Sequence, residues 1–209
     1  MASDSPDTEG RILSVAPSPA EPPAGFVHDV YEHTWTVGRT REQVWTWLCD
    51  PATFTDGQIP PWRVEFLTNE AGETGFAEGV YNTHVGPFIN FSGVLGEIRD
   101  QEYRDLQYFY GSHALSFALF RPTRLQFWVA DTDDGSTLLT LRLDTHVRRR
   151  FRGLWTRMMR IFWKRFGSWC ERAIPNNWLR ELHEHQTDDE VVYRHRWEPD
   201  MIVVWDNRS

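Results

Sequence analysis

Polar and apolar residues alternate over much of the chain between residues 27 and 147, in short runs. Alternation with a period of two is typical of strands that bury one face and expose the other. The runs predict seven strands, at 27–37, 62–67, 77–85, 88–98, 106–110, 125–130 and 137–147. Short separators rich in Gly, Asn and Asp indicate that neighbouring strands are antiparallel. The segment 111–123 lacks clean alternation and is interpreted as a loop or an irregular edge.

Helical spacing replaces the alternation after the first strand. Thr40 is a suitable N-cap, and Val44 and Leu48 recur at helical spacing behind it. The Asp-Pro pair at 50–51 ends this helix or begins a second short one that runs through Phe54. Two short helices are therefore predicted between the first and second strands.

A long amphipathic helix is predicted over 149–174, before Pro175. The apolar residues of its predicted buried face are Phe151, Leu154, Trp155, Met158, Ile161, Phe162, Trp169 and Ala173. This face is expected to pack on the sheet, the only large partner upstream. The sequence therefore predicts an α+β fold in which a curved, seven-stranded antiparallel sheet wraps around the helix and encloses a hydrophobic cavity.

Composition changes along the chain predict three regions. Residues 1–25 are rich in Pro, Ser, Ala, Asp and Glu without periodicity, which is typical of a flexible leader. Residues 26–175 are expected to form the ligand-binding domain. Residues 176–209 are expected to add a short helix, 177–185, and an acidic tail.

Charge and residue usage narrow the class of protein. A net charge of −8 argues against nucleic acid as the main partner. Two cysteines, no signal peptide and no stretch of about 18 apolar residues favour a cytoplasmic protein. The 11 Trp, 13 Phe and 6 Tyr suit both a core and the wall of a ligand cavity.

Motifs for metal, nucleotide or nucleophilic chemistry are not found. His183 and His185 are two residues apart on a predicted helix, so their imidazoles point away from each other. Ser112 and His113 are adjacent, which prevents the geometry of a catalytic triad. The glycines within 72–79 lie between strands and are interpreted as a hairpin loop. No metal and no cofactor is therefore expected.

Several side chains are expected to line the cavity: Trp35, Tyr81, Tyr108, Phe127, Leu141, Met158, Phe162 and Arg165. The Arg165 guanidinium either binds a carboxylate of a ligand or extends to water, or pairs with Glu97. His33, His84 and Tyr108 are candidates for acid–base chemistry, since His titrates near neutral pH. At most one of Tyr81 and His84 faces inward, because their strand parities differ.

A basic cluster, Arg148–Arg150 with Arg152, precedes the long helix. Positive charge at a helix N-terminus opposes the helix dipole, so the cluster is unusual. It could contact anionic lipid or pair with the acidic tails, and membrane contact is not expected.

Three segments carry a resemblance to a known family: TREQVWTWLCDPATF at 40–54, FSGVLGEI at 91–98 and GSTLLTLRL at 135–143. Together with the order of elements over 26–174, they resemble the SRPBCC or START-like helix-grip superfamily, which includes Bet v 1-like plant allergens. Bacterial polyketide cyclase/dehydratase-like proteins are the nearest branch. The resemblance implies the helix-grip fold but no catalytic motif, since the superfamily shares none.

Three functions stay open at this point. The first is binding of a small hydrophobic ligand, aromatic, polyketide-like or lipid, in the internal cavity. The second is a cyclase/dehydratase-type or hydrolytic enzyme that uses His and Tyr in the same cavity. The third is a protein-interaction module of the co-chaperone type, with the acidic tails as contacts.

Overall fold

The computed structural model describes residues 18–19, 21–56, 63–114 and 119–175. The chain divides into two compact units, Met1–Ile174 and Pro175–Ser209, and all elements below belong to the first. The predicted helix 177–185 and the acidic tail lie outside the described residues, as does most of the predicted leader. The three predicted regions therefore stay predictions.

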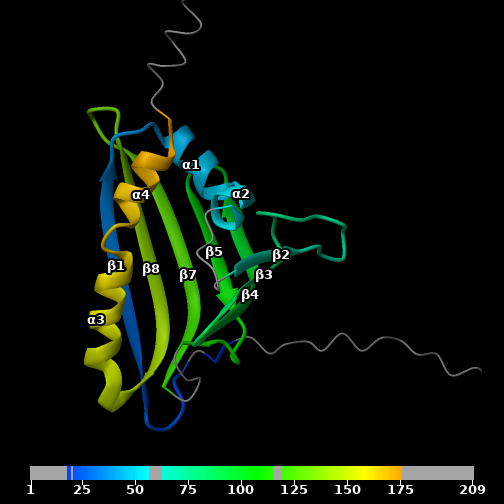
Figure 1. Ribbon diagram of the computed structural model, residues 1–209, viewed down its shortest axis with the longest axis vertical. Helices are drawn as coiled ribbons and strands as arrows, with labels where there is room; N and C mark the ends of the chain where they lie inside the picture. Colours follow the sequence, from blue (N-terminus) through cyan, green and yellow to red (C-terminus); the bar gives the residue numbers. More distant parts are fainter. Residues whose placement is uncertain (1–17, 20, 57–62, 115–118, 176–209) are drawn as a thin grey trace, which may run out of the picture. The chain divides into compact units, whose positions relative to one another are not determined.

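One antiparallel sheet of eight strands forms the main layer of the first unit (Figure 1). Its strands are β1 (Phe26–Val37), β2 (Arg63–Leu67), β3 (Tyr81–Gly86), β4 (Ile89–Arg99), β5 (Tyr103–Tyr108), β6 (His113–Ala114), β7 (Phe120–Asp131) and β8 (Thr137–Arg148). The order is β1-β8-β7-β5-β4-β3-β2, and β6 pairs with β4 and β7. The α+β class and the antiparallel sheet are confirmed, whereas the predicted count of seven strands is wrong.

The additional strand comes from the segment 111–123, which was predicted to be a loop or an irregular edge. Its first part contains the two-residue strand β6, and Phe120 already belongs to β7. The register of β7 against β8 shifts between Pro122 and Arg124. A bulge of this kind moves the following side chains to the other face, which hides the alternation in the sequence.

Helices α1 (Arg41–Cys49) and α2 (Pro51–Thr55) confirm the two short helices. The Thr40 side chain accepts a hydrogen bond from the backbone of Gln43, and the Gln43 side chain bonds back to Thr40, which forms a capping box. Asp50 ends α1 and caps α2 through the backbone N–H of Ala52. The Asp-Pro pair therefore divides the two helices.

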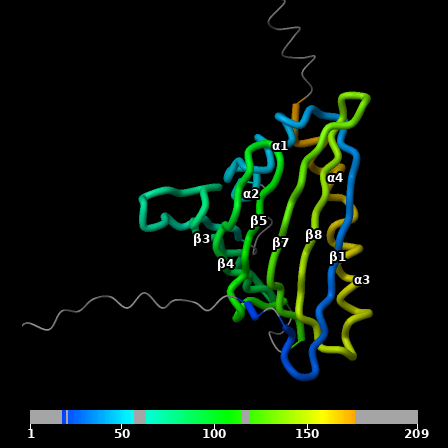
Figure 2. The backbone as a smooth tube through the Cα atoms, turned by 180° about the vertical axis from the view of Figure 1, so that it is seen from behind, coloured from blue at the N-terminus to red at the C-terminus, as the bar shows by residue number. Residues whose placement is uncertain are grey.

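The predicted long helix is two helices. After a 3₁₀ turn, η1 (Arg149–Phe151), the chain forms α3 (Arg152–Trp163) and α4 (Phe166–Ala173), which separate at Lys164 and Arg165. Figures 1 and 2 show α3 and α4 along the β1 end of the sheet, on one face. Their buried side chains are Trp155, Met159, Phe166, Gly167 and Cys170.

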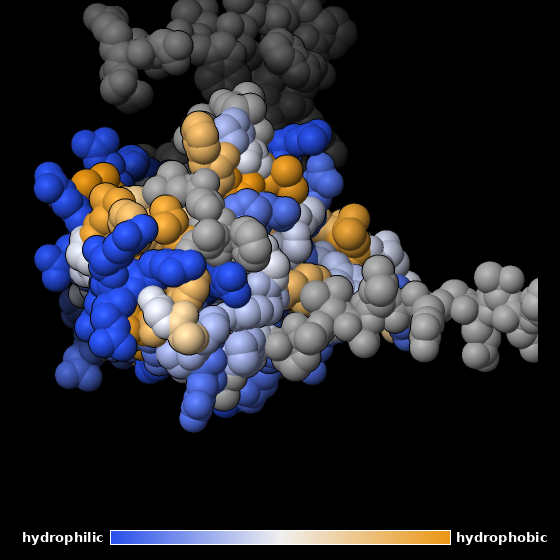
Figure 3. Space-filling view, turned by 90° about the horizontal axis from the view of Figure 1, so that it is seen from below, coloured by the Kyte–Doolittle hydropathy of each residue, from blue (hydrophilic) through white to orange (hydrophobic). Residues whose placement is uncertain are grey.

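The predicted buried face of this helix is correct in part. Trp155 is fully buried, but Leu154, Ile161 and Phe162 are exposed. The reason is that α3 packs against β1 and β8 at one end of the sheet, so a broad apolar stripe cannot all reach it. Figure 3 shows hydrophobic residues beside strongly hydrophilic ones on the side of the molecule where α3 lies.

Gly167 sets the distance between α4 and β1. A Cβ at this position would lie 2.5 Å from Cγ of Trp35, closer than carbon atoms approach in proteins. The missing side chain lets the Trp35 indole pack under the helix, 5.5 Å from the ring of Phe166. None of the described helices is both long enough and apolar enough to cross a bilayer.

Candidate functional site

A buried arginine, Arg104, lies on the sheet face that carries the helices. In β5, Arg104 pairs with Phe127 of β7, and Leu106 pairs with Leu125. Since alternate residues of a strand share a face, Arg104, Leu106 and Tyr108 point to the same side as the buried residues of β7. We call this side the inner face.

His84 and Asn82 of β3 reach the same face. Asn82 pairs with Gly93 of β4, which in turn pairs with Tyr108, and the inner face therefore has no side chain between Asn82 and Tyr108. His84 pairs with Phe91, whose ring lies 5.6 Å from that of Tyr108. We refer to Arg104, His84, Tyr108 and Asn82 as the inner-face cluster.

Three phenylalanine rings surround the Arg104 guanidinium. Its central carbon lies 4.4 Å from the ring centre of Phe76, 4.6 Å from Phe127 and 5.7 Å from Phe54. The residue is 4 % exposed, and its Nε has no hydrogen-bond partner. Among the residues that the structure describes, no carboxylate forms an ion pair with it. Rings attract a desolvated cation by about 2 kcal/mol, which offsets only part of the cost of burying it.

The groups near Arg104 are uncharged at neutral pH. Burial and the Arg104 charge lower the pKa of His84 to about 4. Burial raises the pKa of the Cys49 thiol to about 11 and the pKa of Tyr108 further above its usual value. Burial also lowers the pKa of Arg104 itself to about 10. The inner-face cluster therefore offers one cation, one neutral imidazole and one neutral phenol, without an anion of its own.

The pKa of His84 predicts a loss of stability on acidification. The folded state keeps His84 neutral, whereas the unfolded chain takes up a proton near pH 6.5, so stability present at neutral pH falls between about pH 6.5 and 4. We expect His84→Gln to remove a few kcal/mol of this fall. Urea unfolding at pH 7 and pH 4.5 measures it, with His33→Gln, an exposed histidine, as control. Equal losses in all three proteins would contradict the assignment.

The structure brings some of the predicted site residues together and separates others. Phe127 lies against Arg104, Tyr108 and His84 lie on the same inner face within reach of its charge, and Leu141 is buried on the inner face of β8. Trp35 of β1 and Met158 of α3 are both half-buried. The roles of these residues stay predictions.

Other predicted site residues lie elsewhere. Tyr81 is on the opposite face of β3 from His84, 6.0 Å from the ring of Phe109, so the pair is resolved in favour of His84 facing inward. Phe162 is exposed. Arg165 is exposed at the break between α3 and α4, and His33 is exposed beside Trp35.

Arg104 and Asn82 were not among the residues predicted from the sequence. Arg104 fell outside the predicted strands, because the strand 106–110 was predicted to begin at Leu106 rather than Tyr103. The signal was the two-residue spacing of Arg104, Leu106 and Tyr108, which extends the alternation backwards by one step.

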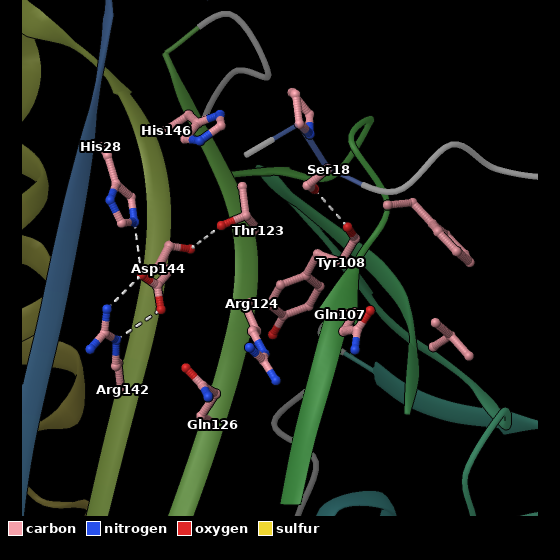
Figure 4. Close-up of a pocket in the computed structure, with 13 residues that line it drawn as sticks. Ser18, His28, Gln107, Tyr108, Thr123, Arg124, Gln126, Arg142, Asp144 and His146 are labelled. Atoms are coloured by element: carbon pink, nitrogen blue, oxygen red, sulfur yellow. Dashed lines mark hydrogen bonds and ion pairs between the residues drawn. The ribbon is translucent and has the colours of Figure 1, made fainter. Parts of the chain in front are cut away.

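The outer face of the sheet carries a polar pocket of about 480 Å³ (Figure 4). His28 hydrogen-bonds Asp144 at 2.7 Å, and Arg142 donates to both oxygens of the same carboxylate. Arg124 donates to the fully buried Asp105 at 2.6 Å. The arginines of this pocket thus have carboxylate partners within the protein, which distinguishes it from the inner-face cluster.

The basic cluster before α3 has partners on the sheet. Arg152 forms an ion pair with the buried Asp29 of β1 at 2.6 Å, and Arg148 lies over the ring of Phe26. Two of the four arginines of the basic cluster therefore have partners on the sheet, and these two need neither a membrane nor an acidic tail as a partner.

Solved structures similar to this chain share its fold. A protein from Nitrosospira multiformis matches with a TM-score of 0.55 and 11% identity, over 73% of this chain and 100% of its own. A protein from Chromobacterium violaceum matches with a TM-score of 0.50 and 12% identity, over 70% and 98%. Norcoclaurine synthase from Thalictrum flavum reaches 0.47 at 13% identity, over 62% and 76%. The first two matches are consistent with a helix-grip-like α+β fold, and membership of the SRPBCC superfamily is not confirmed.

Sequence comparisons point to a different family. The family model of the taurine catabolism dioxygenase TauD, TfdA family matches residues 88–209. The alpha-ketoglutarate-dependent 2,4-dichlorophenoxyacetate dioxygenase of Cupriavidus pinatubonensis is 60% identical over 30 residues, which are 14% of this chain and 10% of the relative. The match thus spans about a tenth of the length of that curated relative.

TauD-family dioxygenases use iron and alpha-ketoglutarate. Such iron sites require two histidines and one carboxylate with free donor atoms. Over 18–19, 21–56, 63–114 and 119–175, no three His, Cys, Asp or Glu side chains are grouped to hold a metal. His28, Asp144 and His146 are near one another on the outer face, but Arg142 and His28 already occupy the Asp144 oxygens. The described residues therefore do not fit an iron site.

The comparisons correct three expectations. A protein that only binds a small hydrophobic ligand is the wrong prediction, because both matches are to enzymes. The polyketide cyclase-like description is wrong for the same reason. A hydrophobic ligand as the main partner is also wrong, since TauD-family dioxygenases use iron, alpha-ketoglutarate and a substrate. Because the family model matches more than half of the 209 residues, the chain belongs to the taurine catabolism dioxygenase TauD, TfdA family.

Proposed function

We propose that this protein is an enzyme that transfers protons on the inner face of the sheet, with His84 and Tyr108 as its catalytic residues. The observation that carries the proposal is the placement of a neutral imidazole and a neutral phenol on the same sheet face as one buried cation without a carboxylate partner among the described residues. Perturbed groups of this kind gather where catalysis needs them. The family match supports an enzyme rather than a carrier.

The reaction that fits these groups removes a proton from a carbon next to a carbonyl group. The neutral His84 nitrogen takes the proton, and the electron pair of the C–H bond moves to the carbonyl oxygen, which becomes an enolate. The Tyr108 hydroxyl donates a hydrogen bond to that oxygen, and Arg104 stabilises its negative charge. An anion beside Arg104 also offsets the field that lowers the pKa of His84, so a bound anion makes His84 a stronger base.

Deuterium exchange tests the proposal. Alpha-ketoglutarate, which the name of the curated relative includes, carries a methylene group next to its keto carbon. In D2O the wild-type protein is expected to speed exchange at this carbon, followed by NMR. His84→Gln and Tyr108→Phe are each expected to slow the exchange by about 100-fold or more.

The exposed His33→Gln is the matched control and is expected to exchange at the wild-type rate. Exchange that is unchanged in both His84→Gln and Tyr108→Phe contradicts the proposal. Absence of any exchange by the folded wild-type protein, over a panel of 2-oxo acids, contradicts it as well.

Dioxygenation is the second candidate function, and the family match favours it. It requires metal ligands from residues outside the described ranges, where the sequence has His183, His185 and His195. Consumption of alpha-ketoglutarate that needs both ferrous iron and oxygen indicates this reaction. Proton exchange by the metal-free protein under nitrogen indicates the first.

A further inference from the structure

We infer that Arg104 binds the carboxylate of a small substrate whose body is apolar, an inference that rests on the enzyme proposed above. The reason is the missing counter-charge. Elsewhere on the sheet the buried carboxylates are matched: Asp105 with Arg124, Asp144 with Arg142, and Asp29 with Arg152. Arg104 is more deeply buried than those arginines and pairs with no carboxylate of the described chain.

The surroundings of Arg104 exclude a structural ion pair within the cluster. The Cys49 thiol and the Tyr108 phenol can carry negative charge within reach of Arg104, and burial makes both hold their protons at neutral pH. A buried charge without a partner costs several kcal/mol. A bound anion offsets that cost, so pairing with Arg104 favours the binding of an anion.

The arrangement of the rings selects a carboxylate. Phe76 and Phe127 each lie within 4.6 Å of the guanidinium carbon, which leaves the N–H edge of the guanidinium for in-plane hydrogen bonds. A carboxylate accepts two parallel bonds from such an edge and carries a single negative charge that matches Arg104. A phosphate dianion brings a second charge into the same apolar surroundings without a second cation.

The apolar body follows from the neighbours of the cluster. Phe54, Phe76, Phe91 and Ile89 are half-buried hydrophobic residues packed against the core. Asn82 is 3 % exposed, and its Oδ1 has no hydrogen-bond partner, so it can accept one from a hydroxyl or amino group of the substrate. The substrate class is therefore a small carboxylic acid with an aromatic or aliphatic body and one donor group.

Calorimetry with the full chain tests the inference, using phenylacetate, its neutral amide phenylacetamide, and phenyl phosphate as probes. We expect phenylacetate to bind at least about 10-fold more tightly than the other two. Arg104→Met is expected to weaken phenylacetate binding by about 10- to 100-fold and to leave phenylacetamide unchanged. Arg104→Lys keeps the positive charge but cannot donate two parallel hydrogen bonds to a carboxylate. Its affinity for phenylacetate is expected to lie between that of the wild type and that of Arg104→Met.

Thermal unfolding supplies a readout that does not depend on binding. Without ligand, Arg104→Met is expected to melt at a higher temperature than the wild type, because it removes an unpaired buried charge. Arg99→Met is the matched control, since Arg99 also lies over a ring, that of Tyr103, but is half exposed and paired with Glu97 and Glu102. It is expected to leave the binding unchanged and to shift the melting temperature only slightly, since an exposed pair contributes less than about 1 kcal/mol.

The outcomes separate this inference from the proposed function. Arg104-dependent binding of phenylacetate without any proton exchange supports the carboxylate site and contradicts the proposed reaction. Exchange that needs His84 but is unaffected by Arg104→Met supports His84 as the base, contradicts the role given to Arg104 in the reaction, and overturns the site. Tighter binding of phenyl phosphate than of phenylacetate, or equal binding of the amide, also overturns it.

Discussion

Replacement of Trp155 by Ala is expected to lower the free energy of unfolding by about 3–5 kcal/mol. Trp155 is fully buried, and its ring stacks on that of Phe120 of β7 at 4.9 Å. Truncation of this side chain removes a large apolar contact and leaves a cavity between α3 and the sheet. Chemical denaturation at pH 7 measures the effect.

Phe162→Ala is the matched control, because Phe162 lies on the same helix, was predicted to share the same stripe, and is 70 % exposed. It is expected to change the free energy of unfolding by less than about 1 kcal/mol. Similar losses in the two variants contradict an orientation of α3 that buries Trp155 and exposes Phe162.

Arg124→Met is expected to cost about 3 kcal/mol of stability, because it leaves the carboxylate of Asp105 buried without its partner. The reverse change, Asp105→Asn, is expected to cost less, since Arg124 is 42 % exposed and water can solvate it. The double variant is therefore expected to be more stable than Arg124→Met alone. Urea unfolding of the three variants forms the double-mutant cycle.

Arg99→Met tests an exposed ion pair at the end of β4 and is expected to cost less than about 1 kcal/mol. Additive losses in the Asp105 and Arg124 cycle contradict a coupled buried pair. A loss at Arg99 as large as that at Arg124 contradicts the role given to burial.

Local sequence patterns were sufficient to predict the elements whose burial or capping depends on residues close together in the chain. The alternation in β1 and β8 predicted both strands to within one residue, because buried and more exposed positions alternate over 28–32 in β1 and over 137–143 in β8. The Thr40 cap and the Asp-Pro pair predicted α1 and α2, since both signals act within one helical turn. The bulge at Pro122–Arg124 hid the start of β7, because a register shift depends on the partner strand.

The candidate site was less accessible to sequence reasoning. His84 and Tyr108 were among the predicted residues because their side chains can exchange protons, whatever the fold. Arg104 was missed because an arginine in a charged segment is usually exposed. Its burial depends on β4 and β7, which lie on either side of β5, and on Phe76 and Phe54 from other parts of the chain.

The amino-acid sequence by itself determined the class of this protein: an antiparallel sheet followed by amphipathic helices, with caps and turns set by nearby residues. The tertiary structure alone decided that α3 and α4 are separate helices, which of their side chains are buried, and that Arg104 has no counter-charge. The physical reason is the distance along the chain over which each interaction acts. Capping and alternation act over a few residues, whereas burial and charge pairing depend on residues that are distant in sequence and meet only in the folded chain.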